Sequence, residues 1–210
     1  MSRPFSRPSR ARHTSFPRSR IASTAARLMA QDGITDPALA KKKAARQLGL
    51  PDDAPMPDNA EVDAELRLYQ ALYQHETQPA HLADLRAEAL RLMNALEPFH
   101  PHITGPVLEG TASAFSPIDL ILFADSAKEV EIFLLNRDWS FEHLKARHEQ
   151  AEAVLQLSTP VAEANLVIFP SQLERQRFHH RDGRPRERAT PAQLKSLMET
   201  DAPHRESPCA

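Results

Sequence analysis

The sequence contains one cysteine and five glycines in 210 residues, and it has no long apolar run. Because Cys209 has no second thiol to pair with, an internal disulfide is excluded, and with it the disulfide-stapled scaffolds typical of small secreted proteins. No stretch approaches the roughly 20 apolar residues of a membrane-spanning helix. We therefore expect a cytoplasmic protein that makes no membrane contact.

Several sequence signatures of catalytic sites are also missing. None of the five glycines precedes a lysine, so the chain lacks a phosphate loop that ends in Gly-Lys-Ser/Thr. It has no Gly-x-Ser-x-Gly turn for a nucleophilic serine. No two histidines have the i,i+4 spacing of a helical metal-binding pair. These patterns therefore give no support to the enzyme classes that depend on them.

Charge is distributed unevenly along the chain. Residues 1–50 carry eleven Lys and Arg and two acids, whereas residues 51–170 carry seven bases and twenty acids. Residues 171–210 are again slightly basic, with eight bases and six acids. Two interpretations remain open. Either the basic ends neutralise the acidic body, or they contact an anionic partner such as nucleic acid or nucleotide phosphate.

Hydrophobic periodicity divides the chain into a helical part and a mixed part. Residues 1–20 are rich in arginine, serine and proline without an acid, which predicts a disordered basic tail. Residues 21–98 have the apolar spacing of four helices, with Asp36 and Asn59 as N-caps of the second and third. After Pro98, short apolar runs favour strands at 103–108, 118–123, 140–147, 151–158 and 164–169, with helices at 125–138 and 191–200.

The sequence therefore predicts an α+β protein in which a helical segment precedes a small mixed β-sheet with helices. The expected divisions are a basic tail (1–20), a helical segment (21–98), an α/β domain (99–200) and a C-terminal tail (201–210).

The stretch "TGPVLEGTASAFSPIDLILF" at residues 104–123 is the most unusual part of the chain. It contains Gly105 and Gly110, and it places Asp119 inside an apolar run, where a carboxylate is costly to bury without a partner. With the expected order of elements, residues 101–170 resemble the nucleotidyltransferase superfamily of the DNA polymerase beta type. In that family a Gly-Gly or Gly-Ser pair follows the first strand, an Asp-x-Asp or Asp-x-Glu pair lies on the second, and a later strand supplies a third carboxylate. The resemblance implies a glycine turn at a triphosphate and carboxylates that hold two Mg²⁺ ions for phosphoryl transfer.

The chain departs from that family pattern at three positions. Gly105 matches the first glycine, but Pro106 stands where glycine or serine belongs and donates no N–H. Asp119 matches the second acid of the pair, but Pro117 replaces the first. Asn165 lies about where the third acid belongs. One acid of three therefore remains.

The resemblance implies nucleotide or nucleic-acid phosphate binding on a degenerate nucleotidyltransferase-like fold. Where catalysis is retained, it implies a transferase in which Asp119 is the catalytic residue and the ligand of Mg²⁺, and in which Gly105 and Gly110 shape the phosphate turn. The other candidate nucleotide-binding residues are Thr111, Ser116 and Asn165; Glu109, Asp125 and Glu163 are nearby acids at spacings that the family does not use. The candidate phosphate partners are the basic residues Arg175, Arg177, Arg181, Arg184, Arg186 and Arg188.

Two alternatives accompany this interpretation. Residues 20–50 resemble the opening of a helix-turn-helix regulator, and Lys41, Lys42, Lys43 and Arg46 could contact a nucleic-acid backbone in a non-enzymatic regulatory protein. The patterns "GxxxEGTA", "IDL" and "VEIFLLNR" also resemble a poorly characterised bacterial group sometimes labelled UDP-N-acetylmuramate–alanine ligase. Such ligases need the phosphate loop that the chain lacks.

Overall fold

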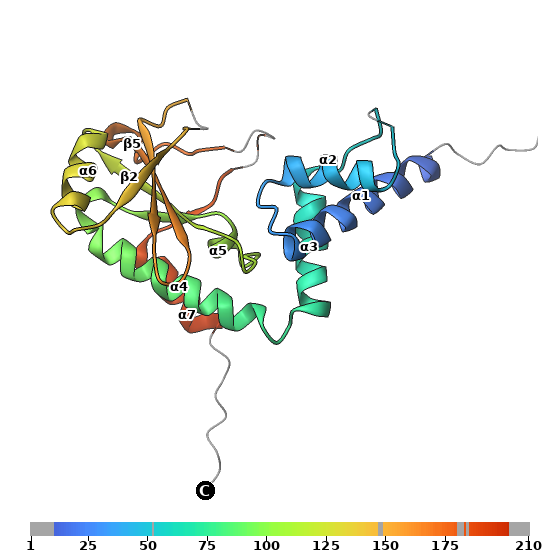
Figure 1. Ribbon diagram of the computed structural model, residues 1–210, viewed down its shortest axis with the longest axis horizontal. Helices are drawn as coiled ribbons and strands as arrows, with labels where there is room; N and C mark the ends of the chain where they lie inside the picture. Colours follow the sequence, from blue (N-terminus) through green and yellow to red (C-terminus); the bar gives the residue numbers. More distant parts are fainter. Residues whose placement is uncertain (1–10, 52, 147–148, 180–182, 184, 202–210) are drawn as a thin grey trace, which may run out of the picture. The chain divides into compact units, whose positions relative to one another are not determined.

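The computed structural model describes residues 11–51, 53–146, 149–179, 183 and 185–201. The chain divides into two compact units, Met1–His75 and Glu76–Ala210. Within the described residues there are seven α-helices and a six-stranded mixed sheet, so the expected α+β class is confirmed (Figure 1). No helix among these residues is long and apolar enough to cross a membrane.

The first unit consists of the helices α1 (Ala11–Gln31), α2 (Pro37–Gln47) and α3 (Asn59–Tyr73). Small side chains dominate its interior, which lets the helix backbones approach closely. Its main buried cluster consists of Ile21, Ala22, Ala25, Leu28, Ala40, Ala44, Ala45 and Val62.

Local side-chain bonds begin the second and third helices. Asp36 caps α2 as expected, because its Oδ1 accepts from the Ala38 N–H at 2.8 Å. The expected cap at Asn59 is wrong by one residue. Asp58 caps α3, and it forms a reciprocal capping box with Glu61, in which each backbone N–H donates to the other side chain at 2.8 Å. Only Asp58 has a glutamate three residues later, as this motif requires.

Helix α1 begins at Ala11, so the prediction of a disordered tail is wrong for residues 11–20. Arg18 ties this part of α1 to α3, because its Nε donates to both carboxylate oxygens of Glu61, at 2.9 and 2.7 Å. These bonds lower the pKa of Glu61. Part of the basic N-terminal excess is thus matched by acids within the same unit. Residues 1–10 and 202–210 lie outside the described residues.

The second unit is built around a sheet whose strand order is β3-β4-β5-β2-β1-β6. Strands β2 and β5 run parallel, and all other neighbours are antiparallel. The strands are β1 (His102–Thr104), β2 (Ile118–Ala124), β3 (Phe141–Leu144), β4 (Ala153–Ser158), β5 (Glu163–Pro170) and β6 (Arg188–Ala189). The helices are α4 (Gln78–Ala95), α5 (Pro106–Glu109), α6 (Ala127–Leu135) and α7 (Pro191–Asp201), with 3₁₀ turns at Glu97–Phe99 and Ser171–Leu173.

Residues of β2 alternate between the two faces of the sheet. Ile118, Leu120 and Leu122 belong to the main hydrophobic core, which is completed by residues of α4, α6 and α7. Ile121 and Phe123 lie on the opposite face and pack with aromatic residues that follow along the chain. Figure 1 shows α4 and α7 side by side against the sheet. Asp119 is two residues before Ile121 on β2, so it shares the face of Ile121 and lies opposite these helices.

Two of the expected boundaries differ from the structure. We expected α4 in the helical segment 21–98, but its apolar face packs on the sheet, with Leu85 and Leu92 in the main core. The strand expected at 103–108 is wrong beyond Thr104. Gly105 has φ +74° and ψ −158°, and Pro106 then occupies the first turn of α5, where its missing N–H is not needed.

The helix predicted at 125–138 is present as α6. Ser126 occupies its N-cap position but makes no side-chain capping bond. The Ala127 N–H instead donates to Glu152 Oε2 at 2.9 Å. The carboxylate of Glu152, the residue just before β4, therefore caps the start of this helix.

Arg86 is a buried arginine on α4 that joins three parts of the sheet unit. Its Nε donates to the Val107 carbonyl at 3.1 Å and its Nη2 to the Leu108 carbonyl at 3.4 Å. Its Nη1 donates to Asp201 Oδ2 at 2.6 Å, although only 5% of the Arg86 side chain is exposed. The carbonyls of the short helix α5 and the last residue of α7 therefore share one donor group.

Replacing Arg86 with leucine is expected to lower the free energy of unfolding by about 2–3 kcal/mol, because buried acceptors lose their donor. Urea unfolding followed by fluorescence measures this, since Trp139 is the only tryptophan in the sequence and lies in the sheet unit. The exposed Arg175 gives the matched variant Arg175→Leu, which should change stability by less than about 0.5 kcal/mol. Equal losses in the two variants would contradict this role.

Candidate functional site

A row of polar side chains crosses the sheet on the face opposite α4, α6 and α7. Residues that pair directly across neighbouring strands share a face of the sheet. The register of each strand pair links one polar residue to the next. From β3 to β6, this polar row consists of Glu142, Gln156, Asn165, Asp119, Thr104 and Arg188.

The centre of the polar row is a hydrogen-bonded chain. Asn165 Nδ2 donates to Asp119 Oδ1 at 2.9 Å, and Gln156 Nε2 donates to Asn165 Oδ1 at 3.4 Å. The amide nitrogen of Asn165 therefore faces Asp119, and its carbonyl oxygen faces Gln156. At the position where the sequence resemblance implied a third carboxylate, the chain thus has a hydrogen-bond donor to Asp119.

Gly105 lies against the other oxygen of the same carboxylate. A Cβ atom added to Gly105 would lie 3.0 Å from Asp119 Oδ2, closer than nearly all real Cβ contacts. The backbone angles of Gly105 also belong to a region that is essentially restricted to glycine. Only glycine therefore lets the turn after β1 touch Asp119.

A guanidinium group lies next to the β1 partner of Asp119. Thr104, which pairs directly with Asp119, is fully buried, and its Oγ1 donates to the Glu187 carbonyl at 2.8 Å. The same oxygen accepts from Arg186 Nε at 3.1 Å. Thr104 therefore holds the half-buried Arg186 close to the strand position opposite the carboxylate.

The other arginines of the basic cluster have separate environments. Arg188 Cζ lies 5.4 Å from the ring centre of Phe123 and 5.7 Å from that of Phe178, and the side chain donates to the Glu174 carbonyl. This arginine is thus packed into the aromatic cluster beside the row. Two members, Arg175 and Arg177, are exposed, and two, Arg181 and Arg184, lie outside the described residues.

His102 also lies on this face, two residues before Thr104. Its ring meets Phe123 edge-on with 5.6 Å between the ring centres. Burial lowers the pKa of His102 below its usual range. The imidazole therefore contributes a neutral packing surface at neutral pH.

The remaining candidate residues of the sequence analysis lie in the connection between α5 and β2. Gly110 ends α5, its carbonyl accepts from Gln78 Nε2 at 3.0 Å, and an added Cβ would lie 3.8 Å from Arg86 Nη2. Thr111 is buried, and its N–H donates to the Pro106 carbonyl at 3.0 Å. Ser116 Oγ accepts from the Ser113 N–H at 2.9 Å. Hydrogen bonds to α4 and within its own turns therefore hold this connection in place. Of the candidate residues, only Gly105, Asp119 and Asn165 come together on the sheet.

The nearby acids do not join Asp119. Glu163 accepts hydrogen bonds from Ser158 Oγ at 2.9 and 3.1 Å, and Asp125, beyond the far end of β2, accepts from Ser171. Glu109 ends the short helix α5. Among the described residues, no group of three or more His, Cys, Asp or Glu is placed to hold a metal ion. The donors present do not fit two Mg²⁺ ions, but one carboxylate fits a single Mg²⁺ that also binds nucleotide phosphates and water.

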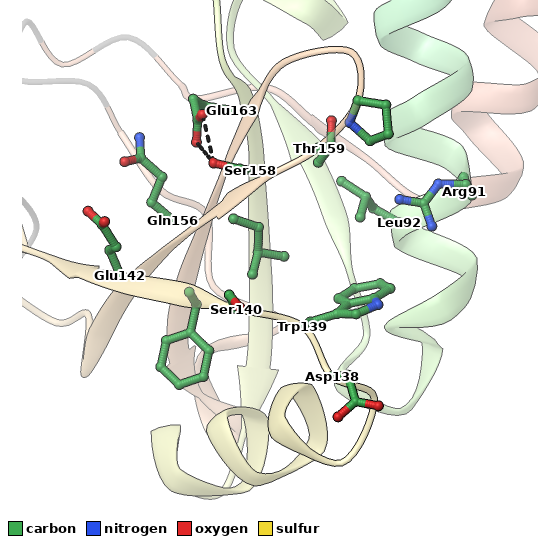
Figure 2. Close-up of a pocket in the computed structure, with 13 residues that line it drawn as sticks. Arg91, Leu92, Asp138, Trp139, Ser140, Glu142, Gln156, Ser158, Thr159 and Glu163 are labelled. Carbon is green, nitrogen blue, oxygen red and sulfur yellow. Dashed lines mark hydrogen bonds between the residues drawn. The ribbon is translucent and has the colours of Figure 1, made fainter.

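A cavity of about 730 Å³ lies beside β3 and β4, and its lining includes Leu92, Phe141 and Leu157 from the helix side of the sheet. Trp139 and Arg91 also line the cavity, and the side chains of Glu142 and Gln156, although at its edge, point away from them (Figure 2). Arg91 is held by a forked pair with Glu88, at 2.8 and 2.7 Å, and its Cζ lies 5.7 Å from the indole centre. Hydrogen bonding from Arg91 lowers the pKa of Glu88.

Sequence analysis did not single out Gln156, Glu142 or Thr104. A usable signal exists for Gln156, because it interrupts the apolar run "AVLQLS" as Asn165 interrupts "ANLVIF". Both residues are polar positions on otherwise apolar central strands, which suggests a shared polar face. Their direct pairing depends on strand register, which the sequence does not reveal.

Some of the basic residues that the sequence analysis assigned to nucleic-acid contact form bonds within the helical unit instead. Lys41 Nζ donates to the Pro57 carbonyl at 3.1 Å and to Asn59 Oδ1 at 2.8 Å. Lys43 pairs with Asp32 at 3.0 Å. Two of the four cations assigned to phosphate contact therefore join elements of the helical unit to one another.

Function has to be inferred from the polar row and the glycine contact. Comparisons of the chain with protein-family models, with curated proteins and with solved structures find no match. The contacts of Asp119, Asn165 and Gly105 are thus the basis for what the site can do.

Gly105→Ala is expected to lower the free energy of unfolding by about 1–3 kcal/mol through backbone strain alone, and by more where the new methyl group displaces Asp119. The double variant Gly105→Ala/Asp119→Ala removes the displaced group, so urea unfolding should show a coupling of about 1 kcal/mol between the two sites. Gly183→Ala is the matched control, because Gly183 has φ +83° with nothing within 4 Å of an added Cβ. If the stability losses of the two single variants simply add up in the double variant, the proposed contact between Gly105 and Asp119 is contradicted.

Asn165→Asp is expected to place two carboxylates at hydrogen-bonding distance, which favours a divalent cation between them. Affinity for Mn²⁺, measured by electron paramagnetic resonance, should rise about tenfold or more over the wild-type protein. In chelator the variant should unfold at lower urea concentration, since like charges repel. The exposed Asn94 gives the control Asn94→Asp, and an equal gain there would assign the effect to net charge.

Proposed function

We propose that the sheet unit binds a nucleoside triphosphate across the polar row. The phosphates lie between the Gly105 turn and Arg186, and a Mg²⁺ ion lies between the phosphates and Asp119. The observation that carries this proposal is the contact of Gly105 with Asp119 beside Arg186. It combines a close backbone approach, a carboxylate and a guanidinium group, which are the groups that proteins use to hold a metal–phosphate complex.

In this proposal, Arg186 is the principal hydrogen-bond donor to the phosphate oxygens. Pro106 removes one backbone N–H from the turn, and the Glu109 and Thr111 N–H groups are used within the α5 turn, by the Gly105 and Pro106 carbonyls. A guanidinium group can replace these donors, because it offers several N–H groups in a fork that suits phosphate oxygens. Oriented by Thr104, Arg186 retains donors beyond its Nε for this contact.

Asp119 makes binding dependent on a divalent cation. A carboxylate close to phosphate oxygens repels them, and a Mg²⁺ ion between the two removes the repulsion. Mg²⁺ commonly binds through one or two carboxylates, with phosphates and water completing its shell. A second ion would need acids where Pro117 and Asn165 stand, so we propose binding without nucleotidyl transfer.

Titration of the full chain with the four nucleoside triphosphates tests this proposal, in Mg²⁺ and in chelator. For the wild-type protein, Kd in Mg²⁺ should be at least about tenfold lower than in chelator. In Asp119→Asn the two values should converge, because the neutral amide neither repels phosphate nor attracts the ion. Arg186→Gln should weaken binding in both conditions.

The control for Asp119→Asn is Asp84→Asn, which removes the same charge from the exposed side of α4. This variant should keep the full Mg²⁺ effect. Absence of nucleotide binding at millimolar concentration would overturn the proposal, and so would an undiminished Mg²⁺ effect in Asp119→Asn. Sustained, Asp119-dependent release of pyrophosphate would show that the chain is a transferase. Displacement of the nucleotide by a short single-stranded oligonucleotide would point to nucleic acid as the physiological ligand.

A further inference from the structure

We propose that Gln156 and Glu142 form a nucleobase subsite that selects bases with an exocyclic amino group. This inference rests on the proposed function and gives the bound nucleotide a direction along the polar row. Neither residue belongs to the phosphate-binding part of the row. Both lie at the β3 and β4 end of the row, where they pair directly across the two strands.

The charges of the row set the direction of the ligand. Arg186 and Arg188 lie at the β1 and β6 end, and Glu142 lies at the β3 end. A nucleoside triphosphate is polar in the same sense, with anionic phosphates at one end and a neutral base with N–H donors at the other. The phosphates therefore point toward β6 and the base toward β3.

The spacing of the strands fits this direction. Asp119 and Gln156 are separated by two strand intervals, which is about 10 Å. A phosphate group and Mg²⁺ at Asp119 leave this distance for the ribose and the base. Gln156, in turn, is joined to Asp119 through Asn165, so the amide group is held in place relative to the phosphate position.

Gln156 and Glu142 retain hydrogen-bonding capacity for a ligand. They are direct cross-strand partners, so their Cβ atoms lie about 5 Å apart. Among the residues that the structure describes, Gln156 uses one N–H toward Asn165, and the carboxylate of Glu142 makes no hydrogen bond. The pair therefore presents an amide that donates and accepts next to a group that only accepts.

This combination matches one class of base edge. Adenine, cytosine and guanine each have an exocyclic amino group that a carboxylate accepts from, next to a ring nitrogen or carbonyl that an amide N–H can reach. Uracil and thymine present a carbonyl at that position, which the carboxylate of Glu142 would repel. Cytosine and uracil have the same size, so CTP and UTP isolate the hydrogen-bonding contribution.

Comparison of CTP, UTP and inorganic tripolyphosphate as ligands of the full chain, all with Mg²⁺, tests the subsite. CTP should bind roughly ten- to a hundredfold more tightly than UTP, and UTP should bind about as weakly as tripolyphosphate. Glu142→Gln offers a donor in place of an acceptor, so it should abolish or reverse this preference. Gln156→Met should bring CTP to the affinity of tripolyphosphate. Tripolyphosphate binding should be the same in all three proteins.

The outcomes separate the two proposals. If tripolyphosphate does not bind the wild-type protein, the phosphate site is wrong and the subsite fails with it. If tripolyphosphate binds in an Asp119-dependent way but CTP and UTP match it, the subsite alone is overturned. The exposed Glu149 and Gln172 give the controls Glu149→Gln and Gln172→Met, which should retain the full preference for CTP. A loss of preference in the controls would also overturn the subsite.

Discussion

The parallel pairing of β2 with β5 places Asp119 directly beside Asn165, and the polar row is organised around that pair. Because the register is fixed by the buried residues Ile118, Leu120 and Leu166 on the helix side, the polar residues on the other face cannot shift by one position without exposing the core. Apolar packing on one face thus fixes hydrogen-bond geometry on the other. The bonds of the row follow from this register.

The second constraint is the short helix α5, which brings Gly105 to the carboxylate. Four residues of helix have little stability of their own, since helix nucleation is costly. Arg86 compensates by donating to the Val107 and Leu108 carbonyls from the packed helix α4. The same guanidinium group binds Asp201 at the end of α7. The position of the glycine turn therefore depends on two helices on the opposite side of the sheet.

The sequence was sufficient for the α+β class, for most strands and for helix α6, because these depend on local hydrophobic periodicity and on capping residues. Through a resemblance in motif order it also selected Gly105, Asp119 and Asn165 among the candidate site residues, and these three come together on the sheet. It did not indicate Gln156 or Thr104, because these join the row only through strand register. Arg86 was missed for a related reason, because a buried arginine on a helix has the same sequence pattern as an exposed one. Its burial depends on tertiary packing against the carbonyls of α5.

Asn165 has a particular consequence for what the row can do. Two carboxylates at 2.9 Å would repel one another and would require a cation or a proton to be stable. An amide at this position instead donates to Asp119 and accepts from Gln156, so the central bonds of the row are satisfied without a metal. Under the nucleotide-binding proposal, an amide at position 165 also provides no carboxylate for a second Mg²⁺ ion. One side chain therefore satisfies Asp119 without a metal and leaves a single carboxylate for the proposed metal–nucleotide complex.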